Sequence, residues 1–166
     1  MSESVTLSVP VDVDAPAEDV WTYVTDWERQ GEWMLGTRVR VSGGDGRGVG
    51  TTLRAITGVG PLGVVDTMEV TEFVPPADGV PGRASVRHTG RIIRGDGRFE
   101  VTALGPHRSR FTFTELLDVP AGAIGLLAWR LGSPVVRLGF VLSLRRMARR
   151  CAAEYRAGRH RTGRAS

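Results

Sequence analysis

The segment from Ser133 to Arg156, SPVVRLGFVLSLRRMARRCAAEYR, carries the clearest periodic pattern in the chain. Its apolar residues recur at steps of three and four, which places them on one face of an α-helix: Val136, Phe140, Leu144, Met147, Cys151 and Tyr155. Ser133 and Pro134 are typical of a helix cap and first helical residue, because the N–H that proline lacks would have no partner there. Gly158 is a typical stop. The pattern predicts a long amphipathic helix that needs an apolar surface to cover.

Upstream of this helix the dominant period is two, which is typical of half-buried strands. We expect seven strands, at residues 5–13, 38–41, 51–57, 64–73, 83–93, 99–104 and 109–119. Glycine-rich breaks separate most of the later strands, and Gly95-Asp96-Gly97 in particular is typical of a tight hairpin turn. Hairpin connections imply an antiparallel sheet.

Helices are expected only near the two ends of the chain. Pro16 and the acidic residues after it predict a short helix, and a kink at Asp26 leads to a second one over residues 28–34. Residues 121–131 predict a short apolar helix before the long one. The separation of helices from strands gives an α+β class.

The 166 residues correspond to one domain. We expect a single domain at 1–158 and a basic, disordered tail at 159–166, and a monomer or weak dimer. We expect a cytoplasmic protein without stable membrane insertion, because there is no signal-like segment, no run of ~18 apolar residues and only one cysteine, Cys151. All basic residues except the histidines are arginine, which we attribute to coding bias and not to phosphate binding.

Four stretches together resemble the polyketide cyclase/dehydrase and lipid-transport superfamily, also called SRPBCC, START-like or helix-grip. They are VTLSVPVDVDAPAEDVWTYVTDWERQGEWM, RVRVSGGDGRGVGTTLRAIT, GDGRFEVTAL, and RSRFTFTELLDVP before the long final helix. The resemblance covers about residues 5–156. It implies a curved seven-stranded antiparallel sheet wrapped around the C-terminal helix, two short helices between the first two strands, and an elongated cavity. Members of this superfamily include cyclases, dehydratases and lipid carriers, so the fold alone does not select an activity.

Several common motifs are excluded. Residues 58–63 match G-x-G-x-x-G, but a strand and not a helix follows, so we interpret them as a hairpin turn. The three histidines, His88, His107 and His160, do not have metal-ligand spacing with one another or with Cys151. We therefore expect neither a metal nor a cofactor.

Three ionisable residues fall on otherwise apolar strand faces. Strand alternation puts His88 with Val86, Asp66 with Met68, and Glu115 with two phenylalanines. Buried charges need partners, so these groups indicate a cavity that holds water or a ligand. Glu115 or His88 would then serve as a general acid or base; alternatively the three groups pair with each other, or with Arg54, and only shape the cavity.

The remaining candidates for ligand contact are large apolar side chains. Trp33 and Met34 are expected at the cavity mouth and Trp129 at its other lip, whereas Trp21 and Trp27 are expected to pack in the core. Further residues could line the cavity or fill the core: Met68, Phe73, Phe99, Phe111, Phe113 and Phe140. Such walls suit an apolar ligand.

Three functions remain open at this stage. The first is binding of a small hydrophobic molecule, which the resemblance implies to be polyketide-like, aromatic or lipid. The second is a polyketide cyclase or dehydratase that uses the acid and base groups above. The third is an interaction module that uses the Arg-rich helix and tail, although Arg145–Arg164 lacks the interleaved aromatics of nucleic-acid binders, so we expect no nucleic-acid partner.

Overall fold

The computed structural model describes residues 3–59, 62–90, 93–119 and 122–162. The side chains of residues 3, 59, 62, 119, 122–132 and 160–162 lie outside this description. The elements are β1 (Glu3–Val13), α1 (Ala17–Thr25), η1 (Trp27–Glu32), β2 (Thr37–Gly43), β3 (Thr52–Val59), β4 (Leu62–Val74), β5 (Gly82–His88), β6 (Gly95–Gly105), β7 (Arg108–Val119) and α2 (Gly122–Thr162).

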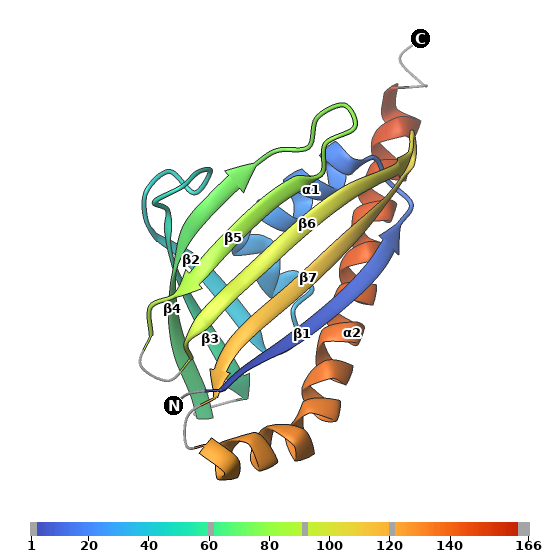
Figure 1. The fold of residues 1–166 in the computed structure, drawn as a ribbon. Helices are drawn as coiled ribbons and strands as arrows, with labels where there is room; N and C mark the ends of the chain where they lie inside the picture. Colours follow the sequence, from blue (N-terminus) through green and yellow to red (C-terminus); the bar gives the residue numbers. More distant parts are fainter. Residues whose placement is uncertain (1–2, 60–61, 91–92, 120–121, 163–166) are drawn as a thin grey trace.

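The strands form one antiparallel sheet in the order β1-β7-β6-β5-β4-β3-β2. Strands β2 to β7 follow each other as a meander, and β1 closes the opposite edge by pairing with β7. Figure 1 shows the curved sheet with α1 and η1 against one face and α2 running beside β1. The expected helix-grip α+β fold is confirmed.

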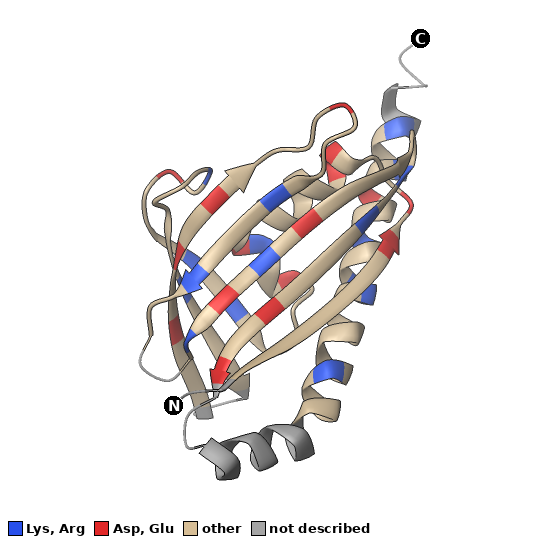
Figure 2. Ribbon diagram, viewed as in Figure 1, with Lys and Arg blue, Asp and Glu red and all other residues tan. Residues whose placement is uncertain are grey.

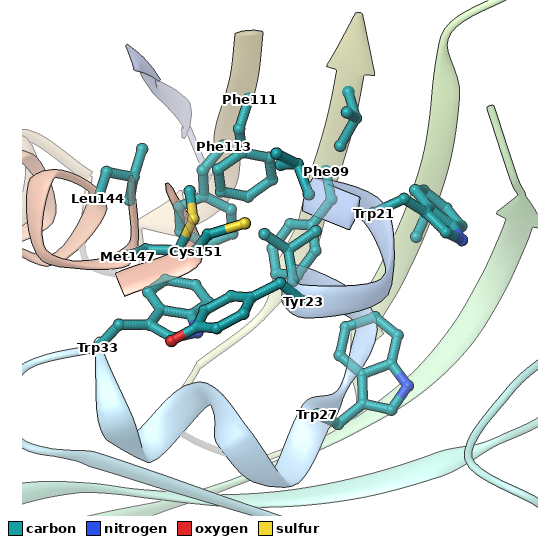
Figure 3. Close-up of a cluster of buried hydrophobic side chains, with 14 of the residues drawn as sticks. Trp21, Tyr23, Trp27, Trp33, Phe99, Phe111, Phe113, Leu144, Met147 and Cys151 are labelled. Carbon is teal, nitrogen blue, oxygen red and sulfur yellow. The ribbon is translucent and has the colours of Figure 1, made fainter. Parts of the chain in front are cut away.

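The core fills the space between the sheet and the helices. Its large side chains come from three sources: Trp21, Tyr23, Trp27 and Trp33 from α1, η1 and the residue after it, Phe99, Phe111 and Phe113 from β6 and β7, and Leu144, Met147 and Cys151 from α2 (Figure 3). The α2 members belong to the apolar stripe of the sequence pattern. The predicted amphipathic helix therefore buries the face that its periodicity indicates.

The C-terminal helix differs from the expectation at both ends. The predicted short helix and long helix are one continuous element, and Pro134 lies inside it. Figure 1 shows that α2 bends in its orange part, and a proline inside a helix is a recognised cause of a bend, because it removes a backbone hydrogen bond. Gly158 does not end the helix, which continues to Thr162, so residues 159–162 are helical and not a disordered tail; residues 163–166 lie outside the description.

The predicted turn before Phe99 is also wrong. Gly95, Asp96 and Gly97 were expected in a hairpin turn, but all three belong to β6, and β5 ends earlier than predicted, at His88. The expected hairpin at residues 58–63 is confirmed by the pairing of Gly58 with Gly63 and Val59 with Leu62.

Candidate functional site

A cavity of about 470 Å³ lies between the sheet, the η1 region and α2. Apolar side chains from all three make up most of its wall, among them Trp27, Leu53, Val86 and Phe140. Leu35 and Val136 line it and are also 46% and 38% exposed, so the cavity reaches the surface between the η1–β2 connection and α2. The backbone N–H of Leu35 donates a hydrogen bond of 3.0 Å to Ser143 Oγ, which ties that connection to α2.

Three ionisable side chains meet in the cavity wall. His88 Nδ1 lies 2.6 Å from Asp66 Oδ2, and His88 Nε2 lies 3.1 Å from Glu115 Oε2. The side chains are only 6% exposed for His88 and Asp66 and 11% for Glu115. We call Asp66, His88 and Glu115 the polar cluster; both nitrogens of its imidazole are engaged by carboxylates.

The sheet register explains how these groups meet. His88 is paired with Met68 on β4, so Asp66, two residues away on the same side, comes within reach of the imidazole. Glu115 is on β7, and the whole of β6 separates it from β5.

Glycine on β6 is what lets the side chains cross that strand. Gly97 is paired with both Val86 and Glu115 in the ladders on its two sides. A Cβ at Gly97 would lie 2.9 Å from Val86 Cγ2 and 3.4 Å from Glu115 Oε1. Gly97 therefore leaves the gap through which His88 and Glu115 form their contact.

Burial and pairing act in opposite directions on the charges of the polar cluster. Burial alone would lower the pKa of His88, but the hydrogen bonds that its ring nitrogens donate to Asp66 and Glu115 outweigh it and raise that pKa to about 10. Burial raises the pKa of Glu115, and the imidazole opposes this rise. A protonated imidazole held between two carboxylates is the arrangement that these effects favour at neutral pH.

Most of the predicted ligand contacts come together at this cavity. Met34, Met68, Phe99, Phe113 and Phe140 line it with apolar atoms. Asp66, His88 and Glu115 supply its ionisable groups. Whether any of them touches a ligand remains a prediction.

Four predicted residues lie elsewhere. Trp33 is fully buried against Phe111, with ring centroids 6.4 Å apart, and neither lines the cavity. Phe73 packs edge-on against Trp21, with ring centroids 5.1 Å apart. Arg54 is exposed, because its neighbours on β3, Leu53 and Ala55, take the inward positions. The side chain of Trp129 lies outside the described residues.

Sequence reasoning also missed several lining residues. Trp27, expected in the core, lines the cavity, as do Gln30 and Ser143. Leu53 and Ala55 were detectable, since their alternation with Arg54 already indicated which side of β3 faces inward. The Gln30 and Ser143 positions depend on how η1 and α2 face each other, which local pattern does not reveal.

Three further features describe the site and its surroundings. In the described ranges no group of three or more His, Cys, Asp or Glu side chains could hold a metal ion. Among the same residues no helix is long and apolar enough to cross a membrane. Figure 2 shows that the charged residues of α2 are mostly basic.

A sheet that grips a long helix around an apolar cavity defines a helix-grip protein. The chain belongs to the polyketide cyclase / dehydrase and lipid transport family, whose sequence model matches residues 4–152. No curated protein sequence matches the chain.

Solved structures share the fold at low sequence identity. TTHA0849 from Thermus thermophilus is 16% identical with a TM-score of 0.73, covering 90% of this chain and 99% of its own. The Zhui aromatase/cyclase from Streptomyces sp. R1128 is 18% identical with a TM-score of 0.68, covering 90% and 94%. A norcoclaurine synthase from Thalictrum flavum is 13% identical with a TM-score of 0.59, covering 90% and 98%. Likeness at this level concerns the fold.

Proposed function

We propose that the chain binds a small, largely apolar molecule, polyketide-like, aromatic or lipid, in the cavity between sheet and α2. The observation that carries the proposal is a 470 Å³ space with mostly apolar walls and one polar cluster. Ligand pockets typically have volumes of about 300–1,000 Å³ and few placed polar groups. Family membership supports the same ligand class.

A cavity-filling variant tests this proposal directly. Gly139 lines the cavity from α2, and a Cβ added there meets no atom within 4 Å. Gly139→Leu should therefore occupy the ligand space without disturbing the fold. Gly158→Leu is the matched control, because Gly158 is on the same helix, away from this cavity, and an added Cβ again meets nothing within 4 Å.

Two measurements give the readout. Native mass spectrometry should detect small molecules carried through purification by the unmodified protein and by Gly158→Leu, but not by Gly139→Leu. In titrations with the neutral dye Nile red, the unmodified protein and Gly158→Leu should bind the dye with similar affinity, and Gly139→Leu should bind it more weakly. Equal binding by the two variants, or no binding by the unmodified protein, would contradict a ligand site in this cavity.

A second candidate function is a polyketide cyclase or dehydratase, favoured by the hydrogen bond between His88 and Glu115 in the cavity wall. Glu115 would take a proton from a carbon between two carbonyl groups of a bound chain. That carbon would form a bond to a third carbonyl carbon as the C=O π bond opens, and the resulting alkoxide would receive the proton and become a hydroxyl. Glu115 would then take the second hydrogen of the attacking carbon, a C=C bond would form, and the hydroxyl would receive this proton and leave as water. Holding the chain in a reactive geometry is worth roughly 7–11 kcal/mol, and the Zhui aromatase/cyclase shares the fold.

Glu115→Gln separates this candidate from simple binding. The amide still accepts a hydrogen bond from the imidazole but cannot take a proton. An enzyme would keep Nile red binding and lose at least about 100-fold in the rate of cyclisation of a poly-β-ketone. An unchanged rate in the variant would remove Glu115 as the base.

A further inference from the structure

We propose that the cavity selects ligands whose polar head is uncharged and donates a hydrogen bond, and that it rejects carboxylate heads. This inference rests on the proposed function and narrows its ligand class. Neutral phenols, alcohols and amides with an apolar body are accepted, whereas fatty acids and aromatic acids are not.

The net charge of the polar cluster is the first argument. One imidazolium between two carboxylates leaves a charge of −1, and moving the imidazole proton to Glu115 leaves this total unchanged. Both carboxylates are already within hydrogen-bond distance of the one imidazole, at 2.6 and 3.1 Å. The cluster therefore has no positive charge left for an anionic head.

The rest of the wall does not supply a cation either. Apart from the polar cluster, the polar groups among the described lining side chains are uncharged: Gln30, Thr37, Thr57, Ser143 and the indole N–H of Trp27. Arg54 lies between two inward-facing residues of β3, but its own side chain is exposed on the other side of the strand. A carboxylate in this space would be a buried charge without a partner, which is strongly unfavourable.

Hydrogen-bond chemistry gives the second argument. Each carboxylate of the polar cluster has lone pairs beyond the one that faces the imidazole, and both nitrogens of His88 are occupied. The cluster thus has an acceptor to offer and no free imidazole donor. A carboxylate only accepts hydrogen bonds, whereas a hydroxyl or primary amide donates them, so only the second kind of head complements the carboxylates of the polar cluster.

The test uses two probes of nearly the same shape, 2-naphthamide and 2-naphthoate, at pH 7.5. Their affinities are measured by competition with Nile red. We expect the carboxylate to bind on the order of 100-fold more weakly than the amide, since like charges placed together in an interface are heavily penalised.

Variants of the polar cluster test whether its charge is the cause. Asp66→Asn/Glu115→Gln removes both negative charges with little change in shape, and should narrow the difference between the probes by about tenfold or more. Glu69→Gln is the matched control, because Glu69 is on β4 like Asp66 but is exposed. It should leave the difference unchanged. Far-UV circular dichroism checks that each variant folds. If the double variant does not fold, the affinities of the two probes for the unmodified protein decide whether the cavity rejects carboxylates.

The outcomes separate the two proposals. Equal or tighter binding of 2-naphthoate by the unmodified protein overturns the selection but leaves cavity binding intact. Displacement of Nile red by neither probe also counts against the selection. If Nile red itself does not bind, the proposed function fails together with this inference. An equal effect of Glu69→Gln and the double variant would assign the preference to overall charge and not to the polar cluster.

Discussion

Replacement of His88 by glutamine should change how the stability of the protein depends on pH. The folded-state pKa of about 10 lies above the value of 6.5 for a free histidine, so the folded state binds more protons between these values. The stabilisation from His88 is therefore complete below pH 6.5 and is lost as the pH rises through 10. At 1.36 kcal/mol per pKa unit, the loss between pH 7 and pH 9 is about 2–3 kcal/mol.

The assay is urea unfolding at pH 7, 8 and 9, followed by tryptophan fluorescence. The free energy of unfolding should fall over this range in the unmodified protein and be nearly flat in His88→Gln. His107→Gln is the control, because that imidazole lies in the exposed turn between β6 and β7. The series stops at pH 9 because the Cys151 thiol, whose pKa is raised to about 12 by burial, adds its own pH dependence above that.

Parallel pH slopes in the unmodified protein and in His88→Gln would refute the reasoning. If the variant is too unstable for unfolding measurements, the ring signals of His88 can be titrated by NMR in the unmodified protein. A midpoint near 6.5 would then contradict an imidazolium held between Asp66 and Glu115.

Three other substitutions compare the contributions of side-chain packing and of ion pairing to the free energy of unfolding. Gly97→Ala places a Cβ 2.9 Å from Val86 Cγ2 and should lower the free energy of unfolding by about 1–3 kcal/mol. Gly105→Ala is the control, because Gly105 is on the same strand and an added Cβ there meets nothing within 4 Å. Equal losses of stability in the two variants would contradict the packing argument. Trp33→Ala should cost about 3–5 kcal/mol in urea unfolding, because this ring is fully buried; a loss below about 1 kcal/mol would show that the site repacks. Glu154→Gln breaks the ion pair between Glu154 and Arg29 of η1, whose side chains are 53% and 31% exposed. The free energy of unfolding should therefore fall by no more than about 1 kcal/mol, and by less in 1 M NaCl.

The strands could be predicted because each has one buried and one exposed face, and the hairpin connections indicated that the sheet is antiparallel. Phe111, Phe113 and Glu115 share the buried side of β7, as alternation indicated. The β5–β6 turn was misplaced because Gly-Asp-Gly is a good local turn sequence. The reason for glycine at position 97 is the side chains of neighbouring strands, which a local pattern does not contain.

The helices show a similar limit. Pro134 was interpreted as a helix start, which is its commonest position, but a proline inside a long helix removes only one hydrogen bond and the surrounding contacts can maintain the helix. Trp33, expected at the cavity mouth, is buried in the core, and Trp27 packs in the core as expected but also lines the cavity. In a stretch as short as η1 the periodicity does not fix which side faces the sheet.

The polar cluster was predictable in its members but not in its connections. Alternation placed Asp66, His88 and Glu115 on inward faces, and burial of charge required them to find partners. That His88 reaches Glu115 over an intervening strand depends on register, which only the structure supplies.

The strand order has a consequence for synthesis. Among the described residues, the first strand pairs only with the last, and the pair of that ladder closest in sequence joins Val13 to Ser109. A ribosome adding about 5–20 residues per second needs on the order of ten seconds between those two positions. During that interval the N-terminal segment, with its alternating valines, has no native neighbour, while β2 to β6 can already assemble as hairpins. Closure of the sheet by β1 is therefore a late event, and until then the edge of β7 and the whole of β1 lack their ladder partners.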